Sequence, residues 1–161
     1  MKKLFSVLAV LFVLGTTSTF ALGIGAQAGY TVNGHTGASL TLKLDNLPPV
    51  FALDLNLGTN YIFFGGTADW WFGNPTIAGP LGFYYGAGIA AGFASANTWT
   101  ALEFGPRLVA GLNLFPVDFL EFYLQAAWQP TFTLWLSGDN SGLSTAWGCV
   151  PLNLGFRFWI R

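Results

Sequence analysis

The chain has 161 residues, of which 53% are hydrophobic, 17% are aromatic and only 8% are charged. Soluble domains carry about a quarter of their residues as charges, so this composition argues against an ordinary water-soluble domain. Beyond residue 21 there are four basic and seven acidic residues, a net charge of −3, and no nucleic-acid partner is expected without a basic patch. The chain has one cysteine, Cys149, and one histidine, His35. That excludes an internal disulfide and a Cys/His zinc site, and we expect no metal and no cofactor.

The first 21 residues have the pattern of a secretory signal peptide. Lys2 and Lys3 precede an apolar run from Leu4 to Gly15, and small and hydroxyl residues then lead to Ala21. This order of a basic, an apolar and a small-residue region is typical of export signals. We expect cleavage after Ala21, which leaves one domain over residues 22–161.

Side chains along that domain alternate between apolar and polar, which is the period of a strand with two different faces. In chain order, the alternation predicts strands over residues 22–32, 38–44, 50–60, 61–72, 81–94, 100–115, 119–136 and 150–160. Gly, Pro, Asn and Asp residues separate them. We expect short links, including NPTIAGP (residues 74–80) and SGDNSG (residues 137–142). The fourth strand is the least regular, because aromatic residues occur on both faces and only Asp69 decides between them.

The charged residues of these strands share one face. In TALEFGPRLVAGLNLF (residues 100–115), Glu103 and Arg107 alternate with a run of large apolar side chains. All seven charges within strands lie opposite the large aliphatic side chains: Lys43, Asp54, Asp69, Glu103, Arg107, Glu121 and Arg157. A charge facing lipid near the bilayer centre would cost about 2–4 kcal/mol.

Alternating strands span a membrane only as a closed barrel, because lipid cannot pair with free backbone groups. The sequence therefore predicts an all-β fold, an eight-stranded antiparallel up-and-down transmembrane barrel. Eight strands enclose a space that side chains can fill, so we expect the seven charges to form an ion network that plugs the lumen. Inward glycines leave room for Tyr84 and Tyr123. Bulky aromatic residues near strand ends, Trp71 and Trp159 among them, are expected in two interfacial girdles.

A helical membrane protein is the alternative architecture. The 33 residues between Asp69 and Glu103 carry no charge, and GAGIAAG contains a Gly-spaced motif that helices use to pack. Pro75, Pro80 and two asparagines interrupt this segment, however, and its glycines fall on alternate positions. The pattern therefore favours strands.

The alternating segments and the final stretch LGFRFWIR (residues 154–161) resemble the small eight-stranded outer-membrane barrels of Gram-negative-type bacteria, as in the OmpA transmembrane domain, OmpX and OmpW. RLVAGLNLFPVDFLEFYLQAAWQP (residues 107–130) is similar to the sixth and seventh strands of an uncharacterised family of these barrels, in which Gly-Leu-x-x-Phe-Pro precedes an inward Glu. The resemblance implies a bacterial outer-membrane location, contact with its lipids and insertion by the outer-membrane assembly machinery. That machinery recognises a terminal strand that usually ends in an aromatic residue, whereas this chain ends Trp159-Ile160-Arg161.

Some barrels of this kind are enzymes that deacylate lipopolysaccharide or transfer a palmitoyl chain to it, with His and Ser near the outer leaflet. His35 is the candidate catalytic residue for such lipid A chemistry. A hydrolytic site needs a nucleophile and an acid placed around the base, and the sequence shows neither a His-x-Ser pairing nor a nearby acid. Glu103 and Glu121 could act as acid and base, but with Arg107 and Arg157 available we interpret them as structural ions.

The leading hypothesis is a non-enzymatic outer-membrane barrel with a structural, envelope-integrity or surface-interaction role, whose surface ligand the sequence does not identify. A lipid A-modifying enzyme that uses His35 and a narrow channel are the alternatives.

Overall fold

The computed structural model describes residues 21–32, 36–45, 47–57, 60–137 and 142–160. Residues 1–20 of the expected signal peptide and His35 fall outside these ranges. Within them, no helix is long and apolar enough to cross a bilayer. The uncharged segment between Asp69 and Glu103 forms strands instead, so the helical alternative is wrong.

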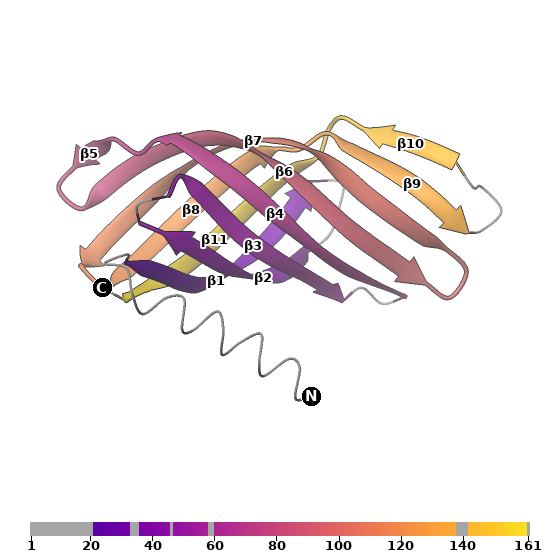
Figure 1. Ribbon diagram of the computed structural model, residues 1–161, viewed down its shortest axis with the longest axis horizontal. Helices are drawn as coiled ribbons and strands as arrows, with labels where there is room; N and C mark the ends of the chain where they lie inside the picture. Colours follow the sequence, from indigo (N-terminus) through magenta and orange to yellow (C-terminus); the bar gives the residue numbers. More distant parts are fainter. Residues whose placement is uncertain (1–20, 33–35, 46, 58–59, 138–141, 161) are drawn as a thin grey trace.

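The described residues form eleven strand segments (Figure 1): β1 (Leu22–Val32), β2 (Thr36–Leu44), β3 (Pro49–Leu57), β4 (Tyr61–Gly73), β5 (Thr76–Ala78), β6 (Leu81–Ala96), β7 (Thr100–Val117), β8 (Leu120–Trp128), β9 (Thr131–Ser137), β10 (Gly142–Ala146) and β11 (Val150–Ile160).

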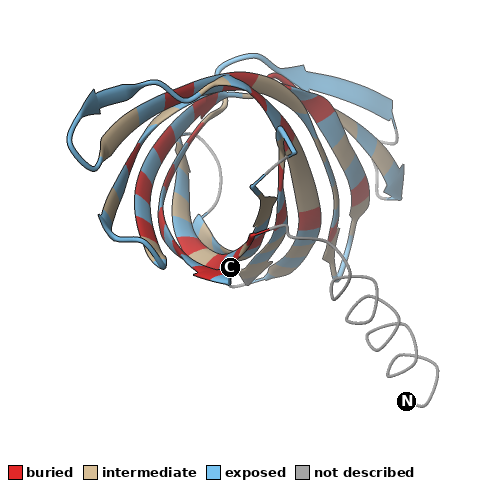
Figure 2. Cartoon of the chain, turned by 60° about the vertical axis from the view of Figure 1, so that its left-hand side comes forward, coloured by how far each residue is buried: buried red, intermediate tan, exposed pale blue. Residues whose placement is uncertain are grey.

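The sheet closes on itself because β1 pairs with β2 along one edge and with β11 along the other. Leu22 lies opposite both Leu44 and Ile160. Neighbouring pairs then run from β2 through β3, β4, β6, β7 and β8 back to β11, and every pair is antiparallel. Figure 2 shows the resulting ring. The prediction of a closed eight-stranded barrel is confirmed.

Three short strands extend this wall where the sequence predicted links or continuous strands. β5 lies within NPTIAGP and pairs with β6. β10 begins at Gly142, the last residue of SGDNSG, and pairs with β9. The predicted strand 119–136 is divided at residues 129 and 130 into β8 and β9, both of which pair with β7. Pro130 accounts for the division, because proline has no N–H to donate to a neighbouring strand.

Buried and exposed residues alternate along the barrel strands, as the banding in Figure 2 shows. From Pro151 to Ile160 every second side chain is buried. The outward positions are apolar and exposed, among them Leu53, Phe64, Ile89, Leu108, Leu124 and Leu154. The wall thus presents a hydrocarbon surface outward and places the polar residues inside.

Large inward aromatic side chains lie opposite glycines of the next strand. Tyr84 is in register with Gly111, and Tyr123 with Gly155. A Cβ atom added at Gly111 would lie 2.4 Å from the Tyr84 Cζ atom, and one at Gly155 would lie 2.5 Å from the Tyr123 Cζ atom. The expectation that glycines make room for these two tyrosines is confirmed.

Candidate functional site

The lumen contains two different halves. The half nearer the termini is filled by eight side chains that we call the packed layer: Lys43, Trp71, Tyr84, Asn113, Glu121, Tyr123, Arg157 and Trp159. The other half is a cavity. The inward positions of the barrel strands continue from one end of the wall to the other. The strands that contribute side chains to one half or both are therefore β1, β2, β3, β4, β6, β7, β8 and β11.

A buried ion pair stands at the centre of the packed layer. The Arg157 Nη1 atom donates to both carboxylate oxygens of Glu121, at 3.2 and 3.1 Å. Trp159 Nε1 donates to the same carboxylate at 3.0 Å, and Asn113 Nδ2 donates at 3.3 Å. The Glu121 side chain is fully buried and that of Arg157 is 1% exposed. Three residues therefore replace the water that the carboxylate loses on burial.

Aromatic rings occupy the rest of the packed layer. Trp71 and Tyr84 are stacked with their centroids 3.9 Å apart and their planes 10° apart. The Arg157 guanidinium lies 4.0 Å from the centroid of Tyr123, and the Lys43 Nζ atom lies 4.8 Å from that of Trp71. Cations on aromatic faces gain electrostatic stabilisation, and the gain is larger where water is excluded.

A chain of hydrogen bonds links the packed layer to the cavity. Tyr123 donates to Gln27 Oε1 at 3.0 Å. Gln27 Nε2 in turn donates to Ser39 Oγ at 3.3 Å, and Ser39 donates to Asp54. In the same layer of the lumen, the Tyr84 hydroxyl donates to Gln125 Oε1 at 3.1 Å. These tyrosine and glutamine side chains separate the two halves.

A second buried ion pair lies beside the cavity. Arg107 Nε donates to Asp69 Oδ1 at 3.0 Å and Arg107 Nη2 donates to Asp69 Oδ2 at 3.3 Å, which is the two-pronged geometry that fits guanidinium to carboxylate. Arg107 Nη1 also donates to Gln129. The guanidinium is therefore held in place on one wall.

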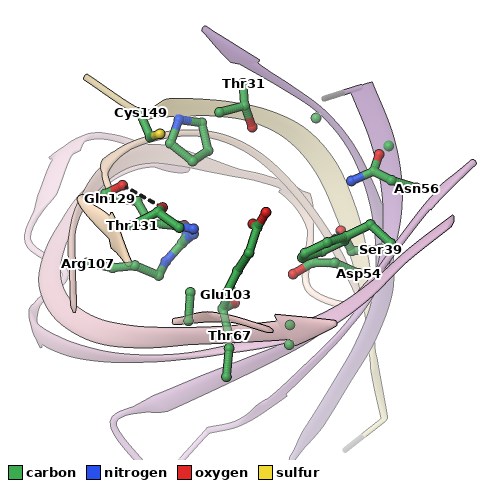
Figure 3. A pocket seen from close by; sticks show the side chains of 18 of the residues that line it. Thr31, Ser39, Asp54, Asn56, Thr67, Glu103, Arg107, Gln129, Thr131 and Cys149 are labelled. Atoms are coloured by element: carbon green, nitrogen blue, oxygen red, sulfur yellow. Dashed lines mark hydrogen bonds between the residues drawn. The ribbon is translucent and has the colours of Figure 1, made fainter. Parts of the chain in front are cut away.

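The cavity has a volume of about 230 Å³. Small polar residues supply much of its lining, including Thr31, Ser39, Thr67, Thr131 and Thr133. Figure 3 shows Glu103 extending into the cavity, with Arg107 on one side and Asp54 on the other. Cys149 also lines the cavity. This space is polar and acidic, and it lies at the end of the barrel away from the termini.

The structure does not bring the seven predicted lumen charges into one group. In the described part of the chain they form two salt bridges, Arg107 with Asp69 and Arg157 with Glu121. Lys43 lies over tryptophan rings, and Asp54 accepts a hydrogen bond from Ser39. Glu103 lines the cavity whereas Glu121 is in the packed layer, so these two carboxylates do not form one acid/base pair.

The location predicted from the sequence is wrong for two tryptophans. Trp71 and Trp159, expected in the interfacial girdles, are buried in the lumen with 8% and 7% of their surfaces exposed. The signal was available, since Trp71 is two residues from Asp69 and Trp159 is two residues from Arg157. Residues two apart on a strand share a face. The same parity places Gln27, which the sequence analysis did not select, in the lumen.

No group of three or more His, Cys, Asp or Glu side chains in the described ranges is placed to hold a metal ion. The chemistry that the lumen offers comes instead from carboxylates, hydroxyls, amides and aromatic rings.

No family model and no curated protein match this sequence. Among solved structures, the N-terminal β-barrel domain of Pseudomonas aeruginosa OprF matches with a TM-score of 0.52 and 17% identity, over 86% of this chain and 97% of that one. This chain has the fold of a small outer-membrane barrel. Neisserial surface protein A (TM-score 0.48, 17% identity, 88% and 97% covered) and E. coli outer membrane protein W (TM-score 0.48, 13% identity, 86% and 97% covered) are also similar.

Proposed function

We propose that this protein is a non-enzymatic, non-conducting barrel of a bacterial outer membrane, with a structural or surface-interaction role. On this proposal, residues 1–21 are a signal peptide that is removed on export, and the barrel of residues 22–161 is inserted by the assembly machinery. Mass spectrometry of the protein purified from the membrane fraction tests the first step. It should give a chain that begins at Leu22.

The membrane location is supported by the outer wall. Soluble monomers rarely expose apolar patches larger than a few hundred Å². Here the outward positions of the barrel strands carry exposed leucines, isoleucines and phenylalanines, while the charged residues of these strands face inward. The fold shared with the OprF barrel domain supports the same location.

The packed layer is the observation that supports a non-conducting barrel. The stacked Trp71 and Tyr84 rings and the buried pair of Arg157 and Glu121 fill the lumen near the termini. A hydrated ion would have to displace these side chains in order to pass. Removing part of a buried charge pair is expensive, so the layer resists opening.

Planar-bilayer recordings of the refolded barrel test this proposal. The unmodified protein should show no single-channel conductance. A variant with Trp71→Ala and Tyr84→Ala should open discrete channels, because it removes the stacked rings from the lumen.

The matched control is Trp70→Ala. Trp70 is the neighbouring residue on the outer face and is 41% exposed, so its removal should leave the barrel closed. Heat-modifiable migration on a detergent gel should confirm that each variant is folded. Steady conductance of the unmodified protein would contradict the proposal and favour the narrow channel.

The enzymatic alternative has a separate test. Cells that express the protein should have the same lipid A acylation with His35 intact and with His35→Ala. A difference between the two lipid profiles would favour the enzyme.

A further inference from the structure

The β9–β10 hairpin extends the barrel wall beyond the rim formed by β1 and β2. Val32, the last residue of β1, lies opposite Val150, and Tyr30 already pairs with Thr36 of β2. β10 precedes Val150 in the chain, so it continues the line of β11 past the end of β1. Among the described strands it pairs with β9 alone. In Figure 1 the hairpin accordingly lies at the end of the molecule away from the C-terminus.

The hairpin has two different faces, as the barrel wall has. Thr131 and Ala146 are in register and line the cavity. Leu134 and Leu143 are also in register but lie on the opposite parity, so they face away from the cavity, and Leu136 shares their face. Leu143 is 64% exposed and Leu136 is 50% exposed. One face of the hairpin is thus polar and the other is apolar and uncovered.

The apolar face is continuous with the outer wall of the barrel. Leu134 is in register with Leu102 of β7, and Phe132 is in register with Phe104. The rings of Phe104 and Phe132 are stacked with their centroids 5.6 Å apart, and Phe132 meets Trp147 edge-on at 6.4 Å. An unbroken apolar surface therefore runs from β7 across the hairpin to the link before β11.

The composition of the hairpin favours lipid as the partner of this face. Neither β9 nor β10 contains a charged residue, and between Glu121 and Arg157 the sequence has one, Asp139, in the link between the two strands. A face of this kind offers nothing to a charged partner, whereas its leucines gain free energy by leaving water. Trp147 is exposed at the border of the face, and tryptophan is enriched where hydrocarbon meets lipid headgroups.

The free edge of β10 is compatible with lipid on the apolar face. An unpaired edge would be unfavourable in hydrocarbon, because its N–H and C=O groups would lack partners. Thr31 near the end of β1 and Ala146 at the end of β10 both line the cavity, so this edge borders the polar lumen. Two copies in one membrane are related by a rotation about its normal, which leaves their strands running the same way. A second copy therefore cannot pair with this edge in an antiparallel manner.

We propose that the outward face of β9 and β10 is a lipid-binding surface, seated among the acyl chains of the leaflet at the end of the barrel away from the termini. The proposal rests on the proposed membrane location and makes the lipid contact one-sided. β7 and β6, beside the hairpin, have 18 and 16 residues, whereas β2 and β3 have 9 each. About 9–11 residues span the hydrocarbon, so the bilayer should be thicker beside the long strands.

Spin labels test the proposal in barrels refolded into phosphatidylcholine vesicles, in a Cys149→Ser background. A label at Leu143→Cys should collide more often with O₂ than with a water-soluble nickel chelate, as labels in lipid do. Leu154→Cys, on the outer wall, is the reference for lipid, and Asp118→Cys, in the exposed turn after β7, is the reference for water. A label at Leu143 that behaves like the one at Asp118 would overturn the proposal. If the label at Leu154 also behaved as in water, the membrane location itself would fail.

The same labels distinguish lipid from a second copy of the chain. Hairpins of two copies that packed together would bring two Leu143→Cys labels close to each other and broaden their spectra. The spectra of fully labelled barrels should instead stay unchanged when unlabelled protein is added in excess. Broadening that disappears on this dilution would overturn the proposal and identify the face as a contact between copies.

Charged substitutions test what the lipid contact does for the hairpin. Leu136→Asp combined with Leu143→Asp should speed amide hydrogen exchange in β9 and β10 about tenfold or more in vesicles, because charges are unfavourable on a lipid face. The amides of β11 should stay protected. The matched control is Leu136→Met combined with Leu143→Met, which keeps the face apolar and should leave exchange nearly unchanged. Equal exchange rates in the two double variants would contradict a seat in lipid.

Discussion

The two halves of the lumen share the strands β2, β4, β6, β7 and β11, yet one half is filled and the other is hollow. In the packed layer, large inward side chains such as Tyr84 and Tyr123 lie over glycines of the neighbouring strand. Around the cavity, the inward side chains are mostly small, as at Ser39, Thr67 and Ala90. Alternation decides which side chains point inward. Their size then decides whether the space they enclose is filled.

The largest expected effect is the difference between the two halves in the stability that is lost when a carboxylate is removed. Glu121→Ala should lower the free energy of unfolding by about 3–5 kcal/mol, because it leaves the Arg157 guanidinium buried without its partner. Glu103→Ala, in the half-open cavity, should cost about 1 kcal/mol or less, as for partly solvated charges. Urea unfolding of the barrel in lipid vesicles measures both.

A double variant sharpens the same result. Glu121→Leu combined with Arg157→Leu should recover most of the loss, since removing both charges leaves neither unpaired. Equal costs for Glu121→Ala and Glu103→Ala would contradict the distinction between the two halves.

The next effect concerns the room that glycine provides in the packed layer. A Cβ at Gly111 would lie 2.4 Å from Tyr84 Cζ and 2.5 Å from the Leu124 carbonyl oxygen. Gly111→Ala should therefore cost about 1–3 kcal/mol through overpacking. At Gly148 no described heavy atom lies within 4 Å of the corresponding position, so Gly148→Ala should leave stability nearly unchanged. Unfolding curves of the two variants make the comparison, and similar midpoints would show that Tyr84 moves aside freely.

The smallest effect is expected at an exposed contact of the β9–β10 hairpin. Trp135 Nε1 donates to Ser144 Oγ at 3.0 Å in an exposed setting. Ser144→Ala should cost about 0.5–1 kcal/mol locally, as for a single exposed hydrogen bond. Hydrogen exchange should become faster for the β10 amides while those of β11 stay protected. Faster exchange in β11 as well would mean that the hairpin supports the barrel wall.

The barrel itself could be predicted from the sequence because period two is strong in most strands. In residues 100–115, for example, all four leucines fall on one parity and both charges on the other. The same alternation predicts that Trp159 faces inward, because it is two residues from Arg157. An expectation based on aromatic girdles overrode that parity and was wrong.

Other features depend on interactions that a single strand does not reveal. Pro130 marks a break, but the pairing of β9 with both β7 and β10 depends on the neighbouring strands. Which carboxylate meets which cation depends on the stagger of the strands. Arg107 pairs with Asp69, 38 residues away, rather than with Glu103 on its own strand. The sequence therefore predicted that opposite charges would pair, but it did not predict which residues would be the partners.

The pairing of β11 with both β1 and β8 has a consequence for assembly. Arg157 and Trp159, which neutralise and cover the Glu121 carboxylate, belong to β11, which follows the other barrel strands in the chain. Until β11 pairs with β8 and β1, Glu121 has neither partner, and the wall has two unpaired edges. The pairing of β11 therefore closes the barrel wall and neutralises Glu121 in the same step. This step comes late in folding, because contacts between distant parts of a chain form slowly.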